Sequence, residues 1–262
     1  MMFRDPLFQR TLVKVVRSSP DLFGGTVDNS IGDKNEWSGL PVIFDEVFTG
    51  IYRLGRFSAA SFLGVDPDIS VHAKLLTGGL VPLCATLASE SIFRAFQTDD
   101  KSDALLHGHS YTAHAVGCQV ALQSLRELQQ MEANGEWDWA KATAAGDQVE
   151  TPSDAAETRR VWSVWGPDFV SWVSHQHQVE GVWALGTVLA LHMGNTDGVS
   201  GYKSNAARGL QAALAAGNLT DGKIHSRVLG NVLYLMAGQK ANSVTIRRIE
   251  GLVRHALQNA AD

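Results

Sequence analysis

The fold class is decided by Phe44-Asp45-Glu46-Val47-Phe48-Thr49-Gly50 together with Ala73-Lys74-Leu75-Leu76-Thr77-Gly78-Gly79. A short apolar run at residues 40–44 leads into the first stretch, and a short strand candidate at residues 69–72 leads into the second. Short continuous apolar runs are typical of strands buried in a parallel sheet. Because ligands of open α/β sheets bind outside the carboxyl ends of the strands, we expect Asp45 and Lys74 to lie near a ligand.

The rest of the chain alternates between helical and extended patterns. Asp5-Pro6 is a favourable helix start, since aspartate can cap a helix and proline is tolerated at its first position. Apolar residues recur at helical or strand spacing in the segments that follow. We expect helices at 6–17, 90–97, 113–131, 156–174, 204–216 and 242–258, and strands at 40–44, 69–72, 83–87, 179–193 and 231–236. This order of elements predicts an α/β protein with a smaller second α/β unit.

Two polar segments interrupt these patterns. Residues 19–38 are rich in Gly, Asn and Asp and are expected to form a long inserted loop. Residues 133–156 are rich in Ala, Gly, Asp, Glu and Thr, which is typical of a surface linker between domains. We therefore expect one domain at 1–132, a linker or insertion at 133–156 and a smaller domain at 157–262.

The composition is that of an ordinary globular protein and excludes several classes of partner. The 262 residues are 45% hydrophobic and 19% charged, and 22 Lys and Arg stand against 27 Asp and Glu, for a net charge of −5. No basic face is implied, so nucleic acid is not an expected partner. The sequence contains no run of about 18 apolar residues, so no membrane span is predicted. Cys84 and Cys118 lie far apart without a CxxC spacing, which favours a reducing compartment.

An acid and a lysine at strand ends suit the chemistry of pyridoxal phosphate. The lysine amine can condense with the cofactor aldehyde, and the carboxylate can pair with the pyridine nitrogen and keep it protonated. A hydroxyl such as that of Ser110 can help to bind the phosphate. Taken singly, however, Asp45 also fits a helix cap, and Lys74 also fits an ordinary solvated lysine.

Two other clusters have competing interpretations. His107, His109, His114 and Cys118 contain the nitrogen and sulfur ligands that zinc prefers, but no other ligand cluster supports a metal site, and we expect none. The three tryptophans Trp162, Trp165 and Trp172 follow a helical spacing. We expect them to pack in a core, with an aromatic platform for a substrate as the alternative.

The two opening stretches resemble class III aminotransferases. Arg53, the turn Asp66-Pro67-Asp68 and the segment Leu105-Leu106-His107-Gly108-His109-Ser110-Tyr111 extend the resemblance in the same order along the chain. Within the class, the likeness is greatest to the diaminopelargonate aminotransferases of biotin synthesis, and especially to eukaryotic forms that follow a dethiobiotin synthetase domain. Two further stretches carry that closer likeness, Asp5-Pro6-Leu7-Phe8-Gln9-Arg10 and His225-Ser226-Arg227-Val228-Leu229-Gly230-Asn231-Val232-Leu233-Tyr234-Leu235-Met236.

The resemblance implies the fold and the cofactor. The fold would be type I of the pyridoxal-phosphate-dependent transferases, with residues 1–132 as the carboxyl-terminal half of a large domain that has a mainly parallel sheet. Lys74 would hold pyridoxal 5'-phosphate covalently and carry protons, and Asp45 would pair with the ring nitrogen. His109 and Ser110 would reach the phosphate of the neighbouring subunit of a homodimer. Many relatives have Pro-Thr at that pair, so the role of His109 departs from the common pattern.

The resemblance also implies a substrate site. Gly108 would line the substrate pocket, and Arg227 would bind the substrate carboxylate, for which its guanidinium fork is suited. Arg53 would support the site structurally. The implied reaction moves an amino group from S-adenosylmethionine to 8-amino-7-oxononanoate and gives 7,8-diaminononanoate.

Relatives have roughly 200 residues before the point that corresponds to Met1, a length inferred from where the cofactor lysine falls. We therefore expect the chain to be a fragment or one half of a split protein that is inactive alone. Two alternatives stay open: another class III ω-aminotransferase, and a non-catalytic partner subunit. The expected partners are small-molecule substrates, a second copy, the missing amino-terminal half and a dethiobiotin synthetase domain. The expected location is mitochondrial or cytoplasmic, and no targeting signal is recognised.

Overall fold

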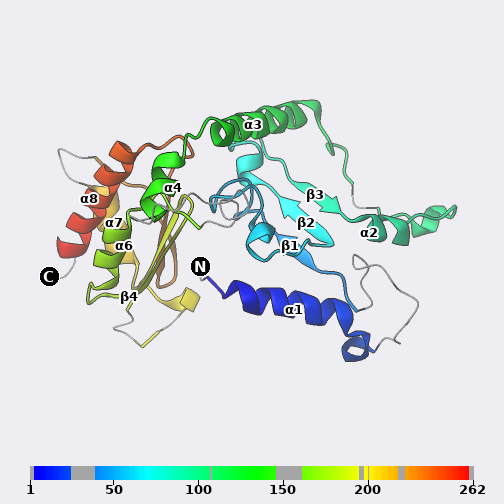
Figure 1. Cartoon of the computed structure of the whole chain (residues 1–262), viewed down its shortest axis with the longest axis horizontal. Helices are drawn as coiled ribbons and strands as arrows, with labels where there is room; N and C mark the ends of the chain where they lie inside the picture. Colours follow the sequence, from blue (N-terminus) through cyan, green and yellow to red (C-terminus); the bar gives the residue numbers. More distant parts are fainter. Residues whose placement is uncertain are drawn as a thin grey trace. The chain divides into compact units, whose positions relative to one another are not determined.

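The computed structural model describes residues 3–24, 39–106, 108–145, 161–194, 198–199, 201–217 and 222–259. The chain divides into two compact units (Figure 1). The first unit contains Arg4–Tyr52 and Arg56–Gln130, and the second contains Met131–Asp262 together with Arg53–Gly55 and Met1–Phe3. The short segment Arg53–Gly55 therefore packs with a part of the chain that lies far away in the sequence.

A three-stranded sheet forms the centre of the first unit. Its strands are β1 (Ile43–Asp45), β2 (Ile69–His72) and β3 (Ala85–Ala88), in the order β1-β2-β3. Strands β1 and β2 are parallel, whereas β2 and β3 are antiparallel. The sequence predicted a mainly parallel sheet, and the described strands form a mixed one. The connection between β2 and β3 has no α-helix, and a parallel crossover usually requires one.

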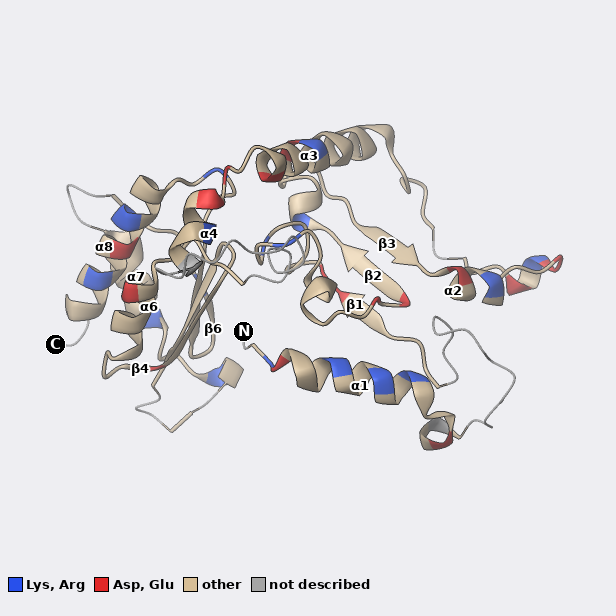
Figure 2. Cartoon of the chain, viewed as in Figure 1, with Lys and Arg blue, Asp and Glu red and all other residues tan. Residues whose placement is uncertain are grey.

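Helices α1 (Pro6–Ser18), α2 (Glu90–Ala95) and most of α3 (Ala115–Ala133) belong to the first unit. Its 3-10 turns are Pro20–Phe23, Ala59–Phe62, Lys74–Leu76 and Lys101–Asp103. The predicted start of α1 is confirmed, because the Asp5 side chain accepts from the amides of Leu7 and Phe8 at 2.7 and 3.4 Å. Several basic residues lie along this helix (Figure 2).

The second unit contains an antiparallel sheet of four strands in the order β4-β5-β7-β6. Its strands are β4 (Val179–Leu185), β5 (Val188–Met193), β6 (Arg227–Leu229) and β7 (Val232–Met236). Its helices are α4 (Asp138–Ala145), α6 (Pro167–Ser174), α7 (Arg208–Ala216) and α8 (Ser243–Asn259), with a 3-10 turn at Gly201–Lys203. Strand β5 lies inside the sheet, and Leu189 and Leu191 on it are fully buried. This sheet is the core of the unit.

Several predicted elements differ from the structure in the second unit. The strand expected at 179–193 is a hairpin that turns at Gly186, whose φ of 54° suits glycine. The helix expected at 156–174 begins at Pro167, and residues 156–160 lie outside the described residues. Within the segment expected to be a linker, 138–145 form α4, because Trp137 and Ala140 provide buried apolar surface. Strand β6 was missed, since only three residues form it.

Trp162 and Trp165 are buried as expected, Trp172 is half-buried, and the three do not share one helix. Trp162 and Trp165 are 5% and 2% exposed and precede α6, while Trp172 lies on it. The ring of Trp162 stacks on that of Trp137 at 5.9 Å between centroids. The guanidinium of Arg254 lies 4.5 Å from the ring centre of Trp172. Throughout the described part of the chain, no helix has the length and apolarity needed to cross a bilayer.

Candidate functional site

Asp45 and Lys74 follow neighbouring parallel strands at the same end of the sheet. Asp45 is the last residue of β1 and lies opposite Val71 of β2. The Glu46 amide then donates to the Val71 carbonyl at 2.9 Å, so the pairing continues past Asp45. Lys74 comes three residues after Val71, just beyond the end of β2. The structure therefore places the expected acid and amine at the carboxyl ends of two adjacent strands.

The backbone of Lys74 is in the left-handed region, with φ of 51°. Such a conformation is uncommon for a residue other than glycine, and it must be held by its surroundings. The Thr77 amide donates to the Lys74 carbonyl at 3.2 Å, and the Ser124 hydroxyl of α3 donates to the Leu75 carbonyl at 2.7 Å. Next in the chain comes the turn Gly78-Gly79, in which both residues have positive φ. These bonds fix the loop that presents an exposed Lys74 side chain.

The two acidic neighbours at the end of β1 have different surroundings. The Asp45 side chain is exposed and its Oδ1 accepts from the Val47 amide at 3.0 Å. Glu46 is 3% exposed, and its carboxylate accepts from the Ser58 hydroxyl at 2.6 Å and from the Ala59 and Ala60 amides at 2.9 and 3.1 Å. Glu46 thus caps the turn Ala59–Phe62, whereas the Asp45 carboxylate is accessible to a ligand.

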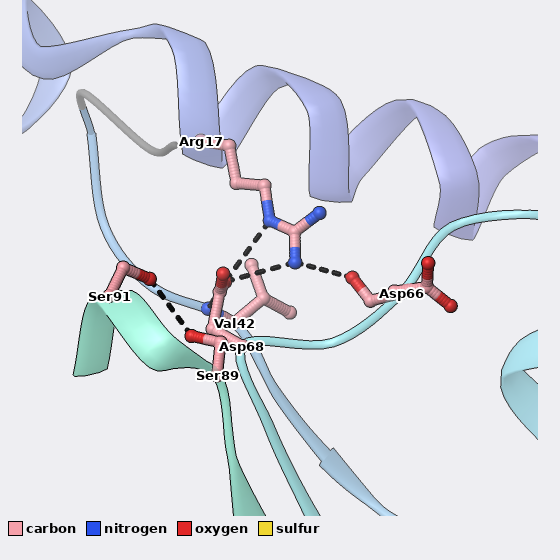
Figure 3. Close-up of polar contacts among 6 residues, drawn as sticks. All are labelled: Arg17, Val42, Asp66, Asp68, Ser89 and Ser91. Carbon is pink, nitrogen blue, oxygen red and sulfur yellow. Dashed lines mark hydrogen bonds and ion pairs between the residues drawn. The ribbon is translucent and has the colours of Figure 1, made fainter. Parts of the chain in front are cut away.

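A second buried carboxylate lies at the opposite end of the same strands (Figure 3). Asp68 is 3% exposed, and its Oδ2 accepts from the Nε of Arg17 at 3.0 Å and from the Val42 amide at 2.6 Å. The Asp68 amide donates to the Val42 carbonyl at 3.0 Å. The Arg17 guanidinium also donates to the Asp66 carbonyl. These bonds join α1, β1 and the start of β2.

The expected phosphate segment is exposed in the first unit. Gly108, His109 and Ser110 all lie on the surface, and His107 lies outside the described residues. The His109 Nδ1 accepts from the Tyr111 amide at 3.1 Å, and the His109 amide donates to the Thr112 hydroxyl at 2.8 Å. These bonds form a local turn. Among the described residues, no three His, Cys, Asp or Glu side chains gather as metal ligands would.

Arg227 lies in the second unit, at the start of β6 and opposite Tyr234 of β7. Its side chain is exposed, and with Tyr202, Arg208 and His225 it lines a cleft of about 520 Å³. Two guanidinium groups and an imidazole at one cleft suit a carboxylate or another anion. Arg53 is also in this unit, where burial lowers its pKa and its carbonyl accepts from the Thr187 amide at 3.0 Å.

The buried carboxylates of Glu46 and Asp68 were not predicted from the sequence. Glu46 was treated only as part of a motif, and the pairing of Arg17 with Asp68 was not expected at all. A polar residue within an apolar strand motif is a usable signal for Glu46, because a buried carboxylate needs donors. Arg17 and Asp68 are 51 positions apart in the sequence, and no comparable signal connects them.

The chain is similar in sequence to known proteins over nearly its whole length. The sequence profile of the class III aminotransferases matches residues 33–148, which include Asp45 and Lys74. A bifunctional dethiobiotin synthetase/adenosylmethionine-8-amino-7-oxononanoate aminotransferase from Emericella nidulans is 56% identical over 98% of this chain. Residues 33–148 belong to the class III aminotransferase family. The corresponding bifunctional protein of rice, named as mitochondrial, is 37% identical over 97% of this chain.

The chain spans 32% of the length of its fungal relative and 26% of the length of the rice protein. An adenosylmethionine-8-amino-7-oxononanoate aminotransferase from Methanocaldococcus jannaschii has the same fold, with a TM-score of 0.63 at 22% identity. That match covers 83% of this chain and 45% of the other. The α/β fold predicted from the sequence, as part of fold type I, is confirmed.

Class III aminotransferases depend on pyridoxal phosphate, so the predicted cofactor class is confirmed for the family. The side chains of this chain fit that group. An exposed amine and an exposed carboxylate follow adjacent strand ends, as covalent attachment and pairing with a ring nitrogen require. The left-handed backbone at Lys74 is of a kind that is often found at functional sites.

Proposed function

We propose that the chain forms the lysine-bearing part of an aminotransferase that converts 8-amino-7-oxononanoate to 7,8-diaminononanoate, with S-adenosylmethionine as the amino donor. The observation that supports this most is the parallel register of β1 and β2, in which Asp45 faces Val71 and Lys74 follows. The relatives that match nearly the whole chain carry this activity in their names. The reaction belongs to biotin biosynthesis.

Lys74 and Asp45 have complementary roles in this proposal. The Lys74 amine would hold the cofactor covalently, and the same nitrogen would take up and return a proton during amino transfer. The Asp45 carboxylate holds a proton on the ring nitrogen. When bound, pyridoxal phosphate supplies a ring that withdraws electrons from the substrate carbon. Glu46 keeps the end of β1 in place through its three hydrogen bonds.

Substrate binding is assigned to Arg227 and Gly108. The guanidinium of Arg227 can bind a carboxylate through two parallel hydrogen bonds, which a lysine cannot reproduce. Its place at a cleft with Arg208 supports this role. Gly108 provides a surface without a side chain next to the substrate. His109 and Ser110 bind the cofactor phosphate of a second copy, which makes the functional protein a homodimer.

The proposed domain organisation follows the same assignment. Residues 1–132 are the carboxyl-terminal half of the cofactor-binding domain, 133–156 an insertion that includes α4, and 157–262 the smaller domain. A dethiobiotin synthetase domain is a further proposed partner, as the names of the fungal and plant relatives describe. A mitochondrial location is proposed from the rice and Arabidopsis relatives, which are named as mitochondrial.

The substrate is tested by an amine-acceptor assay. The chain is mixed with a separately produced amino-terminal half of the fungal relative, loaded with pyridoxal phosphate and given S-adenosylmethionine. We expect 8-amino-7-oxononanoate to be aminated and Arg227→Lys to raise its KM by about tenfold or more. Conversion of γ-aminobutyrate or ornithine in a parallel assay with an oxo acid as the amino acceptor, with 8-amino-7-oxononanoate ignored in the first assay, would refute the pathway assignment in favour of an ω-aminotransferase. Activity that needs no Lys74 would refute the catalytic role of this chain.

A further inference from the structure

Asp68 bonds to Val42 at the start of the parallel pair of β1 and β2. The Asp68 amide donates to the Val42 carbonyl at 3.0 Å, and the Asp68 Oδ2 accepts from the Val42 amide at 2.6 Å. The Ile69 amide donates to the same carbonyl at 3.2 Å. Asp68 and Val42 each directly precede a strand of the parallel pair. These bonds therefore fix the pairing at the end opposite to Asp45 and Lys74.

Side-chain burial specifies this register only weakly. Strand β1 has three residues, and Ile43 at its start is 61% exposed. A strand is held in register when one face is buried, and a strand with exposed side chains on one face can slip. A slip of one residue displaces a side chain by about 3.3 Å and moves it to the other face of the sheet. Such a slip would separate Asp45 from Lys74.

Arg17 provides a second connection to the same carboxylate. Its Nε and Nη2 both lie 3.0 Å from the Asp68 Oδ2, and it donates in addition to the Asp66 carbonyl (Figure 3). The exposed fractions of the two side chains are 24% and 4%. An ion pair with so little solvent on the carboxylate is screened less than a surface pair. The Asp68 carbonyl also accepts from the Ser89 amide at 2.8 Å, after β3.

We propose that Asp68, held by Arg17, is a positioning residue that sets the register of β1 against β2 and so brings Asp45 and Lys74 to one cofactor-binding edge. The part that concerns the cofactor rests on the proposed function. Asp66 offers a matched control. It lies two residues away, its side chain is exposed, and only its backbone carbonyl takes part in the network.

The test compares Asp68→Asn, Asp66→Asn and wild type in the 262-residue chain. Hydrogen exchange is measured at the Glu46 and Ile69 amides, with the α3 amides as a reference. Pyridoxal phosphate is added, the lysine linkage is fixed with borohydride, and the label on Lys74 is counted per folded chain. We expect Asp68→Asn to speed exchange at those two amides, to leave α3 protected and to slow labelling of Lys74 by about tenfold to a hundredfold. Asp66→Asn is expected to match wild type.

Each other outcome also decides the question. Wild-type exchange and wild-type labelling in Asp68→Asn would overturn the proposal, and so would an equal rise in exchange at α3, which would show a purely structural role. If Asp68→Asn does not fold, Arg17→Gln decides by the same criteria, because it keeps the Val42 bond. If wild-type Lys74 is labelled no faster than other lysines, the proposed function fails, while local exchange in the variant still tests the register.

Discussion

Asp45 lies opposite Val71 in the parallel pair of β1 and β2, and the Glu46 amide that follows donates to the Val71 carbonyl at 2.9 Å. This pairing joins the acidic end of β1 to the last residues of β2, which Lys74 follows in the chain. The carboxylate of Asp45 is left exposed, whereas that of Glu46 is buried among donors. The two adjacent acids can therefore be told apart by experiment.

Replacing Asp45 with asparagine should change chemistry and preserve the fold. The amide oxygen of Asn can still accept from the Val47 amide, but a neutral group cannot hold a proton on the ring nitrogen. We expect Lys74 to bind the cofactor and amino transfer to slow on the order of a hundredfold. Single-turnover absorbance of the reconstituted enzyme measures this rate. A rate equal to wild type would show that Asp45 does not pair with the ring.

Replacing Glu46 with glutamine should lower stability. The carboxylate accepts three hydrogen bonds, from the Ser58 hydroxyl and from the Ala59 and Ala60 amides, and an amide can satisfy only part of them. We expect the free energy of unfolding to fall by about 1–3 kcal/mol. Urea denaturation measures the change. Glu90→Gln is the control, since that residue is exposed and an exposed ion pair contributes about 0.5 kcal/mol or less.

Replacing Gly186 with alanine should disrupt the second unit. A Cβ there would lie 2.3 Å from the Leu54 carbonyl carbon and 2.4 Å from the Gly55 nitrogen, and φ is already positive. We expect a loss of more than about 3 kcal/mol in the free energy of unfolding. Gly198→Ala has a similar φ with no atom within 4 Å, so it should cost only about 1 kcal/mol. Equal effects in urea denaturation would contradict the packing of Arg53–Gly55 in this unit.

Glu250 should make the stability of the second unit depend on pH. Burial raises its pKa, and this exceeds the opposing effects of the Gly166 amide, Arg254 and Arg247. A carboxyl group with a raised pKa binds more protons in the folded state, so its contribution is present at acidic pH and is lost as pH rises through the raised pKa. Glu250→Gln should flatten this decline, measured as unfolding free energy from pH 4 to pH 7. Glu180→Gln, at an exposed position, serves as the control.

Most of the helices, α4 and the start of α6 excepted, were predictable because their patterns are local. The Asp5 cap and the strand at 69–72 agree with the structure residue by residue or nearly so. The direction of β3 was not predictable, because an apolar run does not encode whether its partner is parallel. The hairpin at Gly186 was read as one strand, since both halves are apolar.

The site was predictable only where one short motif contains it. Asp45 and Lys74 belong to short sequence motifs that are typical of pyridoxal phosphate enzymes. Asp68 acts through Arg17 and Val42, and these pairings exist only after folding. The same holds for Arg53, whose carbonyl bonds to Thr187 across 134 residues of sequence. Long-range hydrogen bonds carry no periodic signal, and one sequence without relatives cannot reveal them.

The most direct test is peptide mapping after borohydride reduction of the chain loaded with pyridoxal phosphate. We predict that the label is found on Lys74 in preference to Lys14, Lys101, Lys141 and the other lysines, and that Asp66→Asn does not alter this. A label spread evenly over the lysines, or concentrated on one other than Lys74, would contradict the assignment of this chain as the lysine-bearing part of the enzyme.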